Sequence, residues 1–312
     1  MRIVGVDFEA VFGCVPAAEV ENLAALAPLV GAEKAEGIVH ATGFATRRVA
    51  REGTDVIDLV LPAAKRALEG VSASDVGAVV AVSFSNRDRF PALATRLQHA
   101  LGLPGGIAAY DISMACSGWV YGLFAAAQMV NACGKKVLLV DGDVQSAWID
   151  RADANTLAVM GDGAAAALLA PGGGEWEFGF LTDGAGAGTL ACRDAITMDG
   201  FGVFRFVAGP VRRFLESFVR GSAILSGALP AAFVPHQANM YMVRQLADAL
   251  GMGGCVVGSG GKFANTGSCS AALSLADSGA KGTALLAGFG AGLSAAAAIT
   301  TFGDFRRGMV EA

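Results

Sequence analysis

The chain has 312 residues, of which 54% are hydrophobic and 16% charged, and its formal net charge is −5. This length is enough to bury a large core and suggests about two domains. The apolar composition is typical of an α/β protein whose strands are buried on both faces. The acidic balance and the lack of a Lys/Arg cluster argue against a nucleic-acid partner.

Strands and helices alternate in the first half of the chain. Arg2–Phe8 predicts a strand, and no charged segment leads into an apolar one as in a signal peptide. Residues 54–69 carry apolar side chains at helical spacing, with Thr54 as the expected N-cap. Further elements of this half are expected at residues 76–84 (strand), 92–101 (helix) and 136–141 (strand).

The stretch from Tyr110 to Gln128 is the one around which the chain is organised. An apolar run at 107–112 predicts the end of a buried strand, and an Ala-rich segment continues at helical spacing from Trp119. Cys116 therefore lies where a strand turns into a helix, a place where unpaired N–H groups and the helix dipole stabilise a thiolate. A nucleophile is one interpretation of this cysteine, and a buried, inert thiol is the other.

The second half repeats the first after a boundary at Pro171-Gly-Gly-Gly, which divides the chain into halves 1–171 and 172–312. Cys116 follows Gly102 by 14 positions, and Asn265 follows Gly251 by 14. Each point opens an Ala/Ser-rich helix that leads into an apolar strand. Matched order, spacing and chemistry over about 80 residues in each half indicate a duplication.

The uncharged window 284–302 has the length of a membrane span. Three glycines within five positions (Gly288, Gly290 and Gly292) interrupt it, so we expect two buried strands joined by a glycine turn and no membrane segment.

The cysteines show neither a Cys-x-x-Cys pair nor metal-ligand spacing, so no metal site is expected. We expect a cytoplasmic protein with reduced thiols. Those other than Cys116 are expected to be small core residues: Cys14, Cys133, Cys192, Cys255 and Cys269.

Two similar halves packed about a pseudo-two-fold axis place equivalent positions face to face, so Cys116 and Asn265 are expected to meet near the centre. An interface between domains is a usual place for a small-molecule site. His236 directly follows the apolar run 231–235 and begins His-Gln-Ala-Asn, so it lies at a strand end in the half opposite Cys116. A hydrogen-bonded structural histidine is the alternative.

Four motifs together carry a resemblance to a known family: Asp111-Ile-Ser-Met-Ala-Cys-Ser-Gly, Val234-Pro-His-Gln-Ala-Asn, Ala264-Asn-Thr-Gly and Gly288-Phe-Gly-Ala-Gly-Leu. In this order they resemble the β-ketoacyl-ACP synthase III family, over nearly the whole chain. The resemblance implies the thiolase fold, an α/β architecture in which duplicated αβαβα halves form five layers. That fold agrees with the repeat seen in the spacing.

The resemblance also implies a chemistry. Cys116 would accept an acyl group from a thioester, with His236 and Asn265 as its catalytic partners. A malonyl thioester would then lose CO₂, and His Nε2–H and the Asn amide would donate to the enolate oxygen. This is a decarboxylative Claisen condensation by an acyltransferase of fatty acid or polyketide-type biosynthesis. Coenzyme A or acyl-carrier-protein thioesters are the substrates, and no cofactor is expected.

The same resemblance assigns further residues to the substrate. Backbone N–H groups at Cys116 and in the turn that follows residue 288 are expected to hold the tetrahedral oxyanion. Phe90 matches the residue that closes the acyl pocket across a homodimer interface, with plain core packing as the alternative. The substrate-binding set is Phe90, Phe204, Phe289, Gly290 and Ala291.

Better-known members of the family hold coenzyme A with Trp and Arg side chains that this chain lacks; Gly37, Ala41, Ala154 and Tyr241 stand at those positions. This favours loading from an acyl carrier protein, or a role in a specialised pathway. The expected patch for an acidic carrier is Arg205, Arg212, Arg213 and Arg244, with ordinary solvated charges as the alternative.

Two other functions stay open at this point. One is a thiolase-fold acyltransferase that moves the acyl group to a hydroxyl or amine without decarboxylation. The other is a catalytically silent subunit that supports a partner synthase, against which the intact Cys116, His236 and Asn265 argue.

Overall fold

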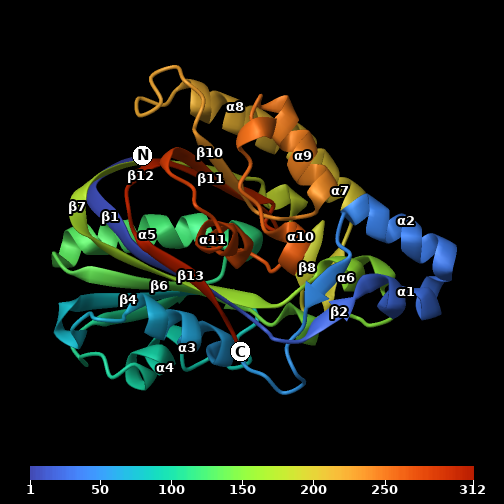
Figure 1. The fold of residues 1–312 in the computed structure, drawn as a ribbon, viewed down its shortest axis with the longest axis horizontal. Helices are drawn as coiled ribbons and strands as arrows, with labels where there is room; N and C mark the ends of the chain where they lie inside the picture. Colours follow the sequence, from blue (N-terminus) through green and yellow to red (C-terminus); the bar gives the residue numbers. More distant parts are fainter.

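The structure is a computed structural model that describes residues 1–312. It has five layers, in which the two halves of one nine-stranded sheet enclose a central pair of helices and further helices cover the outside of each half (Figure 1). The central helices are α5 (Gly118–Cys133) and α11 (Cys269–Ala276). The outer helices are α3 (Val56–Ala67) and α4 (Leu93–Ala100) on one side, and α8 (Arg212–Arg220) and α9 (Met240–Ala249) on the other. This is the duplicated αβαβα architecture that the sequence predicts.

Both halves build their sheets by the same succession of pairings. In the first half β4 runs parallel to β6, and the next pairs, β6–β7 and β7–β1, are antiparallel. In the second half β10 runs parallel to β11, and β11–β12 and β12–β7 are antiparallel. The duplication is therefore confirmed in the topology. The strands are β1 (Arg2–Val15), β4 (Val76–Val82), β5 (Ala108–Ile112), β6 (Lys136–Asp143), β7 (Gly163–Thr182), β10 (Ala232–Pro235), β11 (Gly282–Gly290) and β12 (Ser294–Phe302).

The expected boundary at Pro171–Gly174 lies inside β7. Residues 163–169 of this strand pair with β6, and residues 176–182 pair with β12. The chain thus passes from one half to the other within an unbroken strand. The glycines are needed there because a Cβ on Gly172 or Gly174 would lie 1.9 or 2.3 Å from the carboxylate of Asp7 on β1. These residues mark a close approach of two strands, and they are not a linker.

Helix α3 shows how the local sequence produces an outer helix. Its buried side chains recur at helical spacing and pack on the sheet. The N-cap is Asp55, where the sequence had indicated Thr54. Asp55 forms a capping box with Asp58, which satisfies the first backbone N–H groups of the helix. Helix α11 is different, since all eight of its residues are buried and its sequence contains no charged residue.

The uncharged window 284–302 forms the antiparallel pair β11 and β12 around a glycine turn, as expected. None of the helices combines the length and the hydropathy needed to cross a bilayer. The prediction of core cysteines is confirmed for Cys14 and Cys269 and wrong for Cys192, which is exposed. Cys133 and Cys255 are half-buried.

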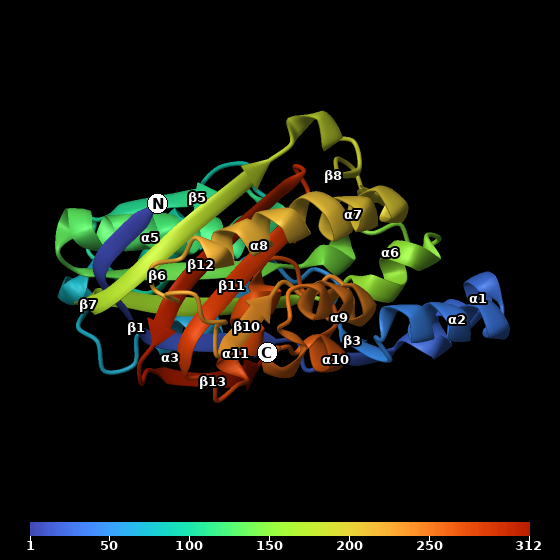
Figure 2. The same ribbon diagram turned by 90° about the horizontal axis from the view of Figure 1, so that it is seen from above.

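The remaining elements decorate the two halves. Seen from above in Figure 2, α1 and α2 project at one end of the molecule, beyond α6. Helix α7 continues through a π-helical segment, Val207–Val211, directly into α8. These elements are α1 (Asn22–Val30), α2 (Ala32–Thr42), α6 (Ala154–Val159), α7 (Gly200–Phe206), α10 (Gly260–Phe263), β2 (Glu19–Glu21), β3 (Thr46–Arg48), β8 (Leu190–Cys192), β9 (Ile196–Met198) and β13 (Arg306–Glu311).

Candidate active site

Cys116 lies in a one-turn 3₁₀ segment, Ala115–Ser117, between the end of β5 and the start of α5. The strand-to-helix turn predicted from the sequence is therefore present. The turn is tight, because Ala115 adopts a positive φ of 41°, which is rare for a residue other than glycine. This conformation presents the half-buried cysteine at the N-terminal end of the central helix.

The end of β11 packs directly against this turn. A Cβ on Gly290 would lie 2.8 Å from both Cβ and Sγ of Cys116, and one on Gly288 would lie 2.9 Å from the Cys116 carbonyl oxygen. Only glycine permits this close approach. The backbone N–H groups of Ala291 and of Cys116 itself lower the pKa of the Cys116 thiol. Two N–H donors therefore face the reactive sulfur from two parts of the chain.

Burial nevertheless raises the pKa of the Cys116 thiol, and the nearby charges of Asp143 and Asp141 raise it further. The donors at the helix N-terminus therefore do not bring the pKa of this thiol below its ordinary value. Desolvation disfavours the charged sulfur more than the donors favour it. The thiol must lose its proton to a base when it attacks.

His236 follows β10 and is 1% exposed. Its Nδ1 lies 3.0 Å from the carbonyl oxygen of Gly267 and 2.8 Å from Oγ of Ser270. A carbonyl oxygen can only accept, so we assign the proton of the neutral ring to Nδ1, which leaves a lone pair on Nε2. Burial lowers the pKa of His236 to about 4, so the ring is neutral at pH 7. The expected Nε2–H donor is thus an acceptor in the resting protein, suited to act as a base.

Asn265 is 6% exposed, and its side-chain amide has a defined orientation. The N–H of Gly267 donates to Oδ1 at 3.0 Å, so Nδ2 carries the two N–H groups that point the other way. One of them makes a long contact of 3.4 Å with the Ala238 carbonyl oxygen. Gly267 therefore orients both partners, because its N–H holds Asn265 and its carbonyl holds the His236 ring.

The three predicted residues lie in one region of the structure, where they are connected through shared neighbouring residues. The ring of Phe289 meets the His236 ring edge-on at 5.7 Å, and the next residue, Gly290, contacts Cys116. Asn265 shares Gly267 with His236. Cys116 lies two residues before α5, and Asn265 lies four residues before α11. The equivalent positions of the two halves thus lie at the ends of the two central helices.

The other predicted substrate residues differ in position. Phe289, Gly290 and Ala291 contact His236 or Cys116, as described above. Phe204 on α7 stacks on Tyr241 at 6.4 Å. Phe90 is 86% exposed, so the core-packing alternative is wrong.

The expected carrier patch spans three neighbouring outer helices, with Arg205 on α7, Arg212 and Arg213 on α8, and Arg244 on α9. All but Arg212 are exposed. Arg212 is half-buried and pairs with Glu216 at 3.1 Å, so it is the least free of the four. Gly37 and Ala41 lie exposed on α2.

Two buried carboxylates beside the site were missed in the sequence. On β6, Asp141 accepts from Oγ of Ser268 at 2.7 Å, and Oδ1 of Asp143 accepts four donors. Both Oδ2 atoms are buried without a partner. Burial raises the pKa of Asp143 to about 6 and, with the charge of Asp143, that of Asp141 well above its usual range. The sequence did contain a signal for these two residues, because acids at positions i and i+2 of an apolar strand lie on the same face of the sheet.

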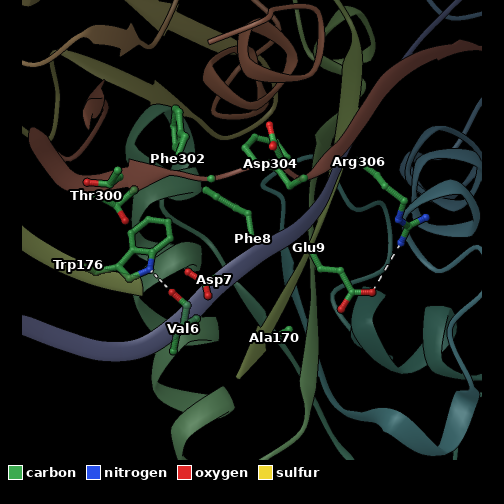
Figure 3. A pocket seen from close by; sticks show the side chains of 13 residues that line it. Val6, Asp7, Phe8, Glu9, Ala170, Trp176, Thr300, Phe302, Asp304 and Arg306 are labelled. Carbon is green, nitrogen blue, oxygen red and sulfur yellow. Dashed lines mark hydrogen bonds and ion pairs between the residues drawn. The ribbon is translucent and has the colours of Figure 1, made fainter. Parts of the chain in front are cut away.

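A cavity of about 640 Å³ lies away from these residues, between β1, β7 and the end of β12 (Figure 3). Its floor is aromatic, and Trp176 Nε1 donates to the Val6 carbonyl at 2.8 Å. Glu9 and Arg306 approach to 3.8 Å at its other end. Neither Cys116 nor His236 lines it.

Two models of one protein family match the chain. The model of 3-oxoacyl-[acyl-carrier-protein] synthase III matches residues 110–184, and the model of the C-terminal part of that family matches residues 230–302. The first range contains Cys116, and the second contains His236 and Asn265.

Relatives and solved structures agree with these matches. The β-ketoacyl-[acyl-carrier-protein] synthase III of Geobacillus kaustophilus is 38% identical over 67% of this chain and 68% of its own length. That of Streptomyces lividans is 35% identical over 83% of this chain and 84% of its own. The 3-oxoacyl-(acyl-carrier protein) synthase of Burkholderia xenovorans superposes with a TM-score of 0.94 at 27% identity, covering 100% of this chain and 98% of that one.

The priming β-ketosynthase of the R1128 polyketide pathway superposes with a TM-score of 0.88 at 31% identity, covering 97% of both chains. These neighbours share the thiolase fold, which confirms the predicted fold class. The motifs around the cysteine, the histidine and the asparagine, the duplicated sheets and these similarities lead to one conclusion: the chain belongs to the β-ketoacyl-ACP synthase III family.

Proposed function

We propose that the chain catalyses a decarboxylative Claisen condensation in which Cys116 carries the acyl group and His236 and Asn265 are its catalytic partners. The proposal depends mainly on Gly267, a single residue that orients both the histidine ring and the asparagine amide. The close contact of Gly290 and Ala291 with the Cys116 sulfur supports the same assignment.

In the loading step, His236 Nε2 takes the thiol proton while the Cys116 sulfur attacks the carbonyl carbon of an acyl thioester. The N–H groups of Cys116 and Ala291 hold the tetrahedral oxyanion. The carbon–sulfur bond of the donor then breaks, and the imidazolium gives its proton to the departing thiolate, which leaves as a thiol. A base is required because the pKa of the buried thiol is raised.

In the condensation step, the malonyl carboxylate leaves as CO₂, and the electrons of that bond form an enolate whose oxygen accepts from Nδ2–H of Asn265. The enolate carbon bonds to the acyl carbon, and Cys116 leaves as a thiolate. This half-reaction consumes one proton, which reaches the sulfur from solvent through Nε2 of His236. The imidazole thus works in both halves of the cycle, whereas the amide of Asn265 works in the second.

We further propose an acyl carrier protein as a substrate and a homodimer as the assembly. The exposed Arg205, Arg213 and Arg244 offer cations to an acidic carrier. Gly37 and Ala41 offer no side chain that grips a nucleotide. The 86% exposure of Phe90 supports a role against a second copy of the chain. A cytoplasmic location and the absence of a cofactor stay predictions.

The test measures both half-reactions. Wild type incubated with acyl-CoA and acyl-carrier panels should gain an acyl adduct by intact mass, and Cys116→Ala should not. Asn265→Ala should lower CO₂ release from a malonyl thioester more than it lowers loading, while Asn131→Ala, an exposed asparagine on α5, changes neither. Equal loss in both half-reactions would contradict the role of Asn265. Acyl transfer to a hydroxyl or amine without CO₂ release would favour the alternative acyltransferase.

A further inference from the structure

A second cavity, of about 630 Å³, lies on the first half of the chain, away from the condensation site. It is formed by α1, the loop after β3, the loop after β4 and the loop after β6. Four arginines line it, Arg47, Arg51, Arg87 and Arg151, and we call it the arginine cavity. Cys116, His236 and Asn265 are not among its lining residues.

The positive charge of the arginine cavity is not neutralised by the protein. Arg51, Arg87 and Arg151 are exposed and form no ion pair within 4.0 Å, and Glu52 is the one acid among the lining residues. The whole chain carries a net charge of −5. A local excess of cations on an acidic protein attracts anions.

Arg47 adds a buried cation to this set. It is 4% exposed, and Nε donates to Oδ1 of Asn22 at 3.0 Å, while neither Nη nitrogen has an acceptor in the protein. The nearest acid, Asp162, already accepts from Ser146 N–H, Ser146 Oγ–H and Ala50 N–H. Burial lowers the pKa of Arg47. Asp162 supplies a nearby negative charge but accepts no hydrogen bond from this guanidinium, so an anion in the cavity would find both Nη nitrogens free to donate.

The rest of the lining indicates an organic ligand rather than a bare ion. Apolar residues from several segments of the chain form the rest of its wall. Guanidinium forks bind phosphate oxygens in pairs, and the volume is in the range of small-molecule sites. The apolar residues are Ala25, Pro28, Leu29, Val49, Ala50, Val144, Ala147, Ile149 and Leu157.

We propose that the arginine cavity is a second binding site, which takes a phosphorylated organic anion of nucleotide size, its phosphates on the arginines and its organic part on the apolar wall. The site goes beyond the condensation reaction. One link joins the two: Val144 and Ser146 flank Gln145, whose Nε2 donates to the Asn265 carbonyl oxygen at 2.7 Å. A ligand in the cavity would therefore contact the loop whose Gln145 side chain holds the backbone of Asn265.

The test is titration calorimetry of the full-length protein with ADP, adenosine and inorganic phosphate. ADP should bind, more tightly than phosphate, and adenosine should not. The double variant Arg51→Gln/Arg151→Gln, which changes two exposed side chains and leaves buried Arg47 in place, should weaken ADP binding at least tenfold. Arg193→Gln/Arg220→Gln removes the same charge from exposed arginines outside the cavity and should bind ADP as the wild type does.

Cys116→Ala should also bind ADP normally, which separates this proposal from the condensation mechanism. The proposal is overturned by no ADP binding at 10 mM, by unchanged affinity in Arg51→Gln/Arg151→Gln, or by equal binding of adenosine. Equal affinity for phosphate and ADP overturns the organic part of the ligand.

Discussion

Gly290→Ala tests whether the close approach of β11 to the nucleophile is required. The new Cβ would lie 2.8 Å from the Cys116 sulfur, where a non-bonded contact needs about 3.5–4.0 Å, so the sulfur or the strand must move by about 1 Å. A displacement of that size at reacting atoms can lower a rate about 100-fold. Gly290 also has a φ of 155°, so alanine adds backbone strain of about 1–3 kcal/mol.

The assay follows acyl transfer to Cys116 by intact mass over time at a fixed concentration of acyl thioester. We expect the loading rate of Gly290→Ala to fall at least about 100-fold. The matched control is Gly282→Ala, at the other end of β11. Gly282 also has a positive φ, of 79°, but its Cβ would meet Ala231 at 3.3 Å and not the sulfur. The control should lose stability and keep its loading rate. A folded Gly290→Ala protein that loads within threefold of wild type would refute the reasoning.

Three further predictions concern stability and pH. Asp55→Ala removes the cap of α3 and should lower the free energy of unfolding, measured in urea, by about 1–2 kcal/mol. Thr54→Ala should change this free energy by less than about 0.5 kcal/mol. A larger loss in Thr54→Ala than in Asp55→Ala would contradict the assigned cap. The folded-state pKa of Asp143, about 6, lies above its ordinary 3.8, so the cost of ionising it is absent below about pH 4 and complete above about pH 6. Each tenfold change in proton affinity corresponds to about 1.4 kcal/mol, so the free energy of unfolding of Asp143→Asn, relative to that of wild type, should rise by up to about 3 kcal/mol between pH 4 and 7. A difference in unfolding free energy that stays constant over this range would count against this pKa. Since burial raises the pKa of Cys116 above 9.0, its alkylation by iodoacetamide, followed by peptide mass, should keep rising from pH 7 to 9; a plateau below pH 8 would show that the thiolate is already formed.

Much of the fold was readable from the chain because the relevant signals are local. The 14-residue spacing that leads to Cys116 and to Asn265 revealed the duplication, and the sheet topology repeats it pair by pair. Periodicity found α3 within two residues at each end. It did not find Asp55 as the cap, since Thr54 and Asp55 are adjacent residues of types that cap helices and only the backbone geometry selects one.

The site divides in the same way. Cys116, His236 and Asn265 were named by their motifs, because each motif is a short run with its own turn or strand end. The proton on Nδ1 of His236 depends on a carbonyl 31 residues away, and the orientation of Asn265 depends on the N–H of the same residue. The first contact follows from the packing of the strand end after β10 against the segment before α11, within the second half of the chain, and the second contact is local.

The sequence by itself determined which residues we propose as catalytic and that the chain folds as two similar halves, since residue type and spacing are properties of short segments. Only the tertiary structure decided their acid–base state. Desolvation and two carboxylates from β6 raise the pKa of Cys116 although a helix begins beside it. The dielectric around a group is set by all the segments that surround it, and here these include β6, the end of β11 and the start of α5.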